Sequence, residues 1–204
     1  MGQYWREDKS YIQSDLAYRL GKIILQYDSA YPIASETNFN SSLYLASLQT
    51  LLTTCNELIH KNDFEFPFRD SFYNISTFVD KRNQFGLNSN MIIENTFSRG
   101  TPKCSVFLNH LRNAMSHPTI TNHESENASS GYTSINEGAI ITKYLFVNRS
   151  HDFPHKVFKI VLTVDELRFL TLALSKFLAQ PYQLRWNIGW NGESFDNNIL
   201  DRAA

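Results

Sequence analysis

Hydrophobic residues recur at three- and four-residue spacings in the first third of the chain, which is the pattern of amphipathic helices. The apolar positions between residues 11 and 30 are Ile12, Leu16, Leu20, Ile23, Ile24 and Tyr27, and Pro32 follows as a terminator. A second pattern runs from Leu45 to Ile59, with Ser41 or Ser42 available as the N-cap. The sequence therefore predicts two helices over residues 11–30 and about 42–61, which we expect to pack antiparallel.

The middle of the chain has weaker periodicity. Residues 64–68 alternate and residues 72–82 return to helical spacing, which predicts a short extended segment followed by a third helix. Residues 88–97 favour another short helix. Gly100-Thr101-Pro102 then breaks the chain, and Thr101 can cap a helix with Pro102 in its first turn. We expect that helix to continue to Pro118.

The amino-acid composition of the chain changes after Pro118. Residues 121–138 are rich in Ser, Asn, Glu and Gly, as in an exposed polar loop. Residues 139–147 and 156–163 are β-branched and aromatic, which predicts a β-hairpin over 139–163. Thr163 and Glu166 form a capping box for a last helix over 164–180, closed by Pro181 and followed by a Trp-containing tail over 181–204.

These elements together predict a mainly α fold in one domain spanning residues 1–204. In this interpretation, residues 11–118 and the last helix form an antiparallel helical bundle, and the β-hairpin is an insertion before the last helix. The 204 residues are 42% hydrophobic and 19% charged, which is sufficient to build a sizeable core.

The charge distribution restricts where a polyanion could bind. A net charge of -1 gives no global attraction for nucleic acid, so such a contact requires a local patch. One stretch, between Glu94 and Glu124, has no acidic residue, although a run of this length can also arise by chance. Within it Arg99, Lys103 and His110 are candidate contacts to a nucleic acid.

Several functional classes have no support in the sequence. The chain has two cysteines, a polar N-terminus and no apolar run near the roughly 20 residues that span a bilayer, so we expect a cytoplasmic protein without a disulfide framework. No GxGxxG, Walker, CxxC or HExxH motif is present. His151 and His155 have a metal-ligand spacing only on a helix, and Pro154 favours a surface loop instead. We therefore expect neither a metal nor a cofactor.

The strongest candidates for catalytic residues lie in the segment Arg112-Asn113-Ala114-Met115-Ser116-His117-Pro118. RNA cleavage by the neighbouring 2′-hydroxyl needs a base, an acid and a fixed cation on the phosphate. Histidine can serve as base and acid, and an arginine guanidinium can bind the phosphate. Five residues advance an ideal helix by about 140°, which would separate the two side chains. Because Pro118 disfavours the α conformation at His117, that residue can turn back towards Arg112.

A purely structural alternative explains the same residues. His117 could cap the last helical carbonyls while Arg112 is a solvated charge. The spacing alone is not specific, because about one Arg–His match is expected by chance in this chain. Arg149 and His155 supply a second match, in the predicted hairpin loop. Glu57 and His60 could approach the same site, but a solvated helix end is the favoured account of them.

The extended segment from Leu111 to Pro118 resembles the signature of the HEPN superfamily, and the order of helices resembles its plasmid- and defence-associated branch. The resemblance covers residues 11–118 and the last helix. It implies a dimeric helical bundle in which two motifs face one cleft and cut RNA without a metal. His117 would be the general acid/base, Arg112 would hold the scissile phosphate, and Asn113 would position both.

Three functions follow as hypotheses. The first is a HEPN endoribonuclease in a toxin–antitoxin or phage-defence setting, with RNA as substrate, a homodimeric assembly and an antitoxin or other silencing partner. The second is a catalytically inert HEPN domain that binds RNA or a protein. The third is an unrelated helical interaction protein.

Overall fold

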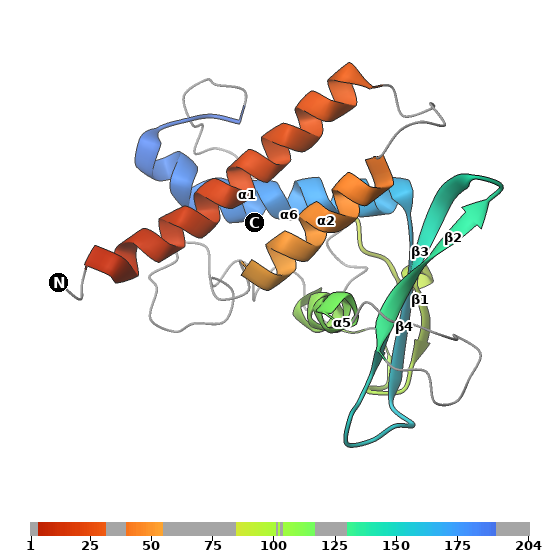
Figure 1. Cartoon of the computed structure of the whole chain (residues 1–204). Helices are drawn as coiled ribbons and strands as arrows, with labels where there is room; N and C mark the ends of the chain where they lie inside the picture. Colours follow the sequence, from red (N-terminus) through yellow and green to blue (C-terminus); the bar gives the residue numbers. More distant parts are fainter. Residues whose placement is uncertain are drawn as a thin grey trace.

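The computed structural model describes residues 4–31, 40–54, 85–100, 102, 104–116 and 130–190. In chain order the elements are α1 (Tyr4–Ala30), α2 (Asn40–Thr54), η2 (Ser89–Met91), β1 (Ile92–Asn95), α5 (Cys104–Ser116), β2 (Gly131–Glu137), β3 (Ile140–Arg149), β4 (Val157–Thr163) and α6 (Val164–Trp186). Figure 1 shows the helices α1, α2 and α6 on one side of the molecule and the sheet on the other. The predicted helix over 72–82 lies outside the described residues.

The four strands form one antiparallel sheet in the order β1-β4-β3-β2. The fold is therefore mixed α/β, and the mainly α bundle with a β-hairpin insertion, expected from the sequence, is wrong. The two central strands, β3 and β4, lie where the hairpin was predicted. The two outer strands were not predicted, and they turn that hairpin into a sheet.

Both unpredicted strands take their structure from their neighbours. β1 replaces the short helix expected over residues 88–97, because Ile92 and Asn95 pair with Ile160 and Phe158 of β4. β2 occupies part of the predicted polar loop over 121–138, and most of its residues are exposed, as on an edge strand. A polar edge strand has the composition of a loop, so its local sequence carries little β signal.

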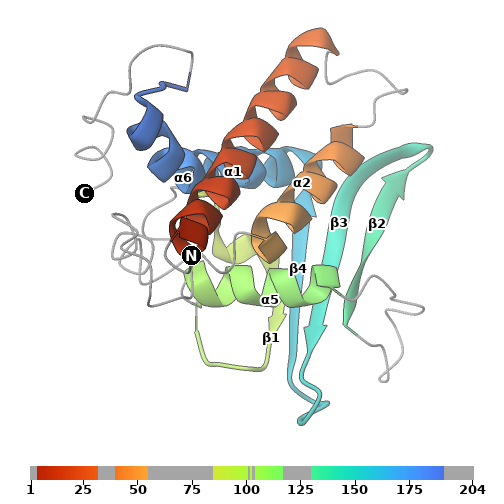
Figure 2. The same ribbon diagram turned by 60° about the vertical axis from the view of Figure 1, so that its left-hand side comes forward.

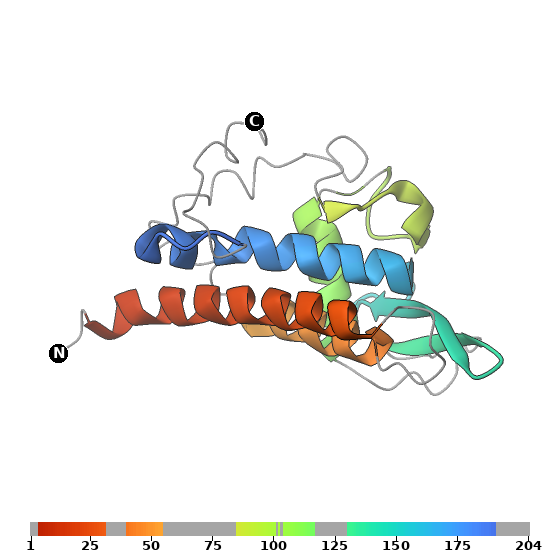
Figure 3. The same ribbon diagram turned by 90° about the horizontal axis from the view of Figure 1, so that it is seen from above.

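The helical layer is organised around α6. Figure 3 shows α1 and α6 side by side and running in opposite directions, and α2 also packs against α6. The buried residues of this layer include Leu170, Leu174 and Leu178 of α6, Ala17 and Ile24 of α1, and Leu48 and Leu51 of α2. At Gly21 a Cβ atom would lie only 2.5 Å from Cη2 of Trp190, so glycine allows the segment after α6 to pack against α1.

The boundaries of α6 confirm one expectation and correct another. The capping box is present, since Thr163 N donates to Glu166 Oε2 at 2.8 Å and Glu166 N donates to Thr163 Oγ1 at 3.2 Å. The helix does not end at Pro181 but continues to Trp186. The buried Ser14 hydroxyl explains this, because it accepts from Tyr182 N at 2.9 Å and donates to Leu178 O at 2.8 Å. It thereby bridges two backbone groups next to the proline.

α5 lies across one face of the sheet and also contacts α2 (Figure 2). Phe107 of α5 packs edge-on against Phe158 of β4, with ring centroids 6.0 Å apart. At its other end Gln49 Nε2 of α2 donates to Met115 O at 3.1 Å. The helix that contains the Arg112 segment is thus held by both layers of the fold. Among the described helices, none has the length and apolarity needed to cross a bilayer.

Candidate functional site

Arg112 and Asn113 lie in the last two turns of α5, and their side chains contact each other. Arg112 Nη2 and Nε donate to Asn113 Oδ1 at 2.9 and 3.3 Å. These two bonds use two of the five N–H donors of the guanidinium. The amide oxygen therefore holds the guanidinium in one orientation.

The polar face of α5 is opposite its packed face. The residues that pack inward are Cys104, Phe107, Leu108, His110, Leu111, Ala114 and Met115. Arg112 and Asn113 are half-buried, whereas Asn109 and Ser116 on the same side are exposed. Ser116 Oγ donates to Arg112 O at 2.9 Å, which ties the end of the helix to the backbone of the arginine. Arg112 is thus partly exposed on this face.

His117 and Pro118 are the next residues along the chain, and they lie outside the described part of the structure. The approach of His117 to Arg112 therefore stays a prediction. The side chain of Lys103 also lies outside the described residues, as do the residues at positions 57 and 60. Arg99 is exposed in the turn between β1 and α5, where it can contact a ligand.

His110 occupies a different position from the one that its sequence context suggested. Its ring stacks on the ring of Phe158, with centroids 4.4 Å apart. The ring of Phe97 also contacts it, with a centroid distance of 4.6 Å. Asn148 of β3 is bonded to His110 through Nδ2 and Nδ1, which are 2.6 Å apart. Burial lowers the pKa of His110 to about 4, so the ring is neutral near pH 7. Only 8% of the residue is exposed, which makes His110 an anchor of α5 on the sheet and leaves little of it open to a ligand in solvent.

This burial makes stability depend on pH. Between pH 6.5 and 4 the unfolded imidazole takes up a proton that the folded one, with its lowered pKa, does not, so the folded state loses stability as the pH falls. We expect a loss of about 2 kcal/mol from this group between pH 7 and pH 5. The measurement is urea unfolding of the wild type and His110→Gln at both values. Equal losses in the two proteins would show that His110 is not the source.

Cys104 and the pair His151 and His155 lie away from Arg112 in sequence and differ in their burial. Cys104 is buried at the start of α5, and burial raises the pKa of its thiol to about 12, which keeps it protonated and unreactive. His151 and His155 are both exposed in the β3–β4 loop. Among the residues that the structure describes, no three His, Cys, Asp or Glu side chains are grouped as metal ligands.

Sequence reasoning missed Gln49 and Asn148, which hold the helix from its two sides. Gln49 is 66 positions from Met115, and Asn148 is 38 positions from His110. A single polar residue in an otherwise apolar pattern is a weak signal, and here only Asn148, within an apolar strand, could have indicated a buried partner.

Comparison with known proteins gives one match. The model of the family described as HEPN pEK499 p136 matches residues 1–183, which is most of the chain. No curated protein and no solved structure matches. The matched range contains α5 with Arg112 and Asn113, and also the whole of the sheet. The chain therefore belongs to this plasmid-associated HEPN family, which confirms the resemblance found in its sequence.

Proposed function

We propose that the protein is a metal-independent endoribonuclease of the HEPN type. The observation that carries this proposal is the contact between Arg112 and Asn113 on the accessible face of α5. It orders a guanidinium on the last turns of α5, five residues before His117 in the sequence. Family membership supports a nuclease or RNA-binding role in general, and this geometry favours the nuclease.

In the proposed reaction His117 takes the proton of the ribose 2′-hydroxyl, and the resulting oxygen attacks the adjacent phosphorus. The bond from phosphorus to the 5′-oxygen breaks, and that oxygen receives a proton from the protonated histidine or from its counterpart in a second subunit. Arg112 donates to the non-bridging phosphate oxygens, where charge accumulates in the transition state. Asn113 is a positioning residue that acts through Arg112.

The assembly and setting belong to the same proposal. A homodimer would place two α5 ends at one cleft, so that two histidines and two arginines surround a single phosphate. An enzyme of this type in a toxin–antitoxin or phage-defence system requires a silencing partner, such as an antitoxin. We place this activity in the cytoplasm, where RNA is available.

The proposal predicts the chemistry of the products. Incubation of a single-stranded RNA with the protein in EDTA should give fragments that end in a 2′,3′-cyclic phosphate and begin with a 5′-hydroxyl. Mass spectrometry of the fragments distinguishes these ends from the 3′-hydroxyl and 5′-phosphate of water-mediated cleavage. RNA that stays intact but binds in a salt-sensitive manner would instead support the inert HEPN domain.

A further inference from the structure

The end of the β3–β4 hairpin carries an ordered group of basic and aromatic residues that the proposed active site does not use. We call it the hairpin patch and define it as Arg149, His151, Phe153, His155 and Lys156. The loop residues 151–155 are all exposed, and Phe153 is 52% exposed. Arg99 belongs to the neighbouring turn that follows β1.

Hydrogen bonds give this loop a fixed shape. Arg149 Nη1 donates to Pro154 O at 2.7 Å, and Lys156 N donates to Phe153 O at 2.8 Å. Ser150 N donates to Lys156 O at 3.0 Å, which closes the loop at its base. A loop that is already ordered loses little conformational entropy when it binds a ligand.

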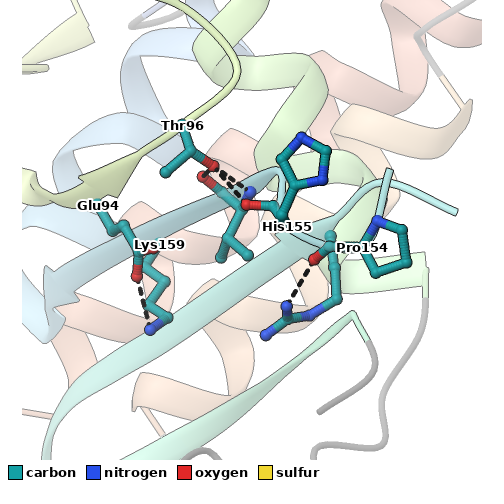
Figure 4. Close-up of polar contacts among 7 residues, drawn as sticks. Glu94, Thr96, Pro154, His155 and Lys159 are labelled. Carbon is teal, nitrogen blue, oxygen red and sulfur yellow. Dashed lines mark hydrogen bonds and ion pairs between the residues drawn. The ribbon is translucent and has the colours of Figure 1, made fainter. Parts of the chain in front are cut away.

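The turn after β1 is fastened to the same loop. Thr96 Oγ1 donates to His155 O at 3.1 Å and accepts from Val157 N at 2.6 Å, as Figure 4 shows. Asn95 Oδ1 accepts from Phe97 N at 3.1 Å, which folds the turn that presents Arg99. Thr96 of this turn therefore lies against the base of the loop, although the two segments are far apart in the sequence.

The charges of this surface favour an anion. Residues 95–100 and 149–156 contain three Lys or Arg residues and a single carboxylate, Asp152, which lies 3.3 Å from His151 Nδ1. Next to the patch the carboxylate of Glu94 is paired with Lys159 at 2.7 Å (Figure 4). Its charge is thus compensated, and it does not oppose an anion at the loop.

The aromatic ring distinguishes the patch from a merely solvated basic loop. Lys156 Nζ lies 4.9 Å from the centroid of Phe153, and His155 packs edge-on at 6.1 Å. A single exposed phenylalanine is common on protein surfaces. An exposed ring beside a lysine on an ordered loop, however, can stack on an unpaired base while the lysine binds a phosphate.

We propose that the hairpin patch is a binding site for single-stranded RNA, distinct from the cleavage site on α5. That its ligand is RNA rests on the proposed function, whereas the single-stranded form follows from the exposed ring. Phe153 stacks on a base, and Arg149 and Lys156 contact the backbone. The bond between Asn148 and His110 connects the root of this loop to α5, so strand capture and cleavage share one rigid support.

The test uses a fluorescent 2′-O-methyl oligonucleotide of about 12 nucleotides, a single-strand site size, because it has no free 2′-hydroxyl and stays intact. Fluorescence anisotropy with the full chain in EDTA gives Kd and its dependence on salt. Phe153→Leu keeps an apolar side chain but removes the π face, so we expect Kd to rise about tenfold. Lys156→Gln should lower the slope of log K against log salt by about 0.7.

Matched controls lie at the opposite end of the same sheet. Ile140 is 49% exposed, and Lys143 is an exposed cation on β3. Ile140→Ala and Lys143→Gln should leave Kd unchanged. The proposal is overturned if Phe153→Leu and Lys156→Gln bind like the wild type, or if the controls weaken binding equally.

Cleavage assays separate this inference from the proposed function. If His117→Ala stops cleavage of ordinary RNA while the patch variants keep the wild-type KM and Kd, the proposed ribonuclease activity is supported and the RNA-binding role of the hairpin patch is rejected. If binding depends on the patch residues but no RNA is cleaved, the RNA-binding role of the hairpin patch is supported and the proposed ribonuclease activity is rejected.

Discussion

Arg112→Lys is expected to slow RNA cleavage by about 10²–10³-fold while the protein keeps its fold. Lysine retains the positive charge but has no planar fork, so it cannot bind Asn113 Oδ1 and a phosphate together in the observed orientation. The loss should appear in kcat, since the contact matters most where charge develops on the phosphate. Single-turnover cleavage of a labelled RNA measures it.

The matched control for this change is Arg19→Lys on α1. Arg19 is exposed and also contacts a neighbouring side chain, Asp15, at 2.9 Å. The Arg19→Lys variant should cleave RNA at the wild-type rate. Circular dichroism and thermal unfolding should show that both variants are folded. A wild-type rate for Arg112→Lys would mean that the guanidinium does not bind the scissile phosphate.

Asp28→Ala is expected to lower the free energy of unfolding by about 3 kcal/mol, a large effect for a single polar residue. Asp28 on α1 accepts a hydrogen bond from the Tyr44 hydroxyl of α2. It also accepts from Arg168 Nε of α6 at 2.6 Å. The carboxylate thus joins three helices, and its side chain is only 10% exposed. Its removal leaves the guanidinium of Arg168 and the hydroxyl of Tyr44 without their acceptor.

Asp15→Ala provides the comparison on the same helix. Asp15 also binds an arginine, but its partner Arg19 is 66% exposed and lies four residues away on α1. Such surface pairs contribute about 0.5 kcal/mol. Urea unfolding of the two variants should therefore give clearly different losses. Equal losses would show that the three-helix contact at Asp28 does not support the fold.

Helical periodicity predicted the parts of the fold whose burial repeats locally. α1, α2, α5 and α6 lie where the apolar spacing placed helices, although α1 begins at Tyr4, earlier than expected. The two central strands could also be predicted from local sequence, since β4, for example, is a short run rich in β-branched residues. β1 and β2 were not visible, because their strand character comes from pairing with β4 and β3. The continuation of α6 to Trp186 depends on Ser14, which is 164 positions from Leu178.

In the candidate site, too, candidate residues could be picked out from the local sequence, whereas features set by contacts in the folded chain could not be predicted. The sequence singled out Arg112 and Asn113, and their side chains are in contact, but adjacent residues on a helix do not normally face each other, so the spacing did not predict that contact. His110 was mistaken for a surface contact, because its neighbours Phe97, Asn148 and Phe158 come from three other segments. Its position on the apolar side of α5, between Phe107 and Leu111, was the local signal that favoured burial. An acid-free stretch of sequence does not show which of its cations face solvent.

The most direct test of the proposed ribonuclease is a comparison of the wild type with His117→Ala in EDTA. The initial rate of cleavage of one labelled single-stranded RNA is measured at equal concentrations of folded protein. We expect metal-independent cleavage by the wild type and a rate at least about 10²-fold lower for His117→Ala, because the general acid/base is removed. Cleavage at the same rate by both proteins would contradict the account.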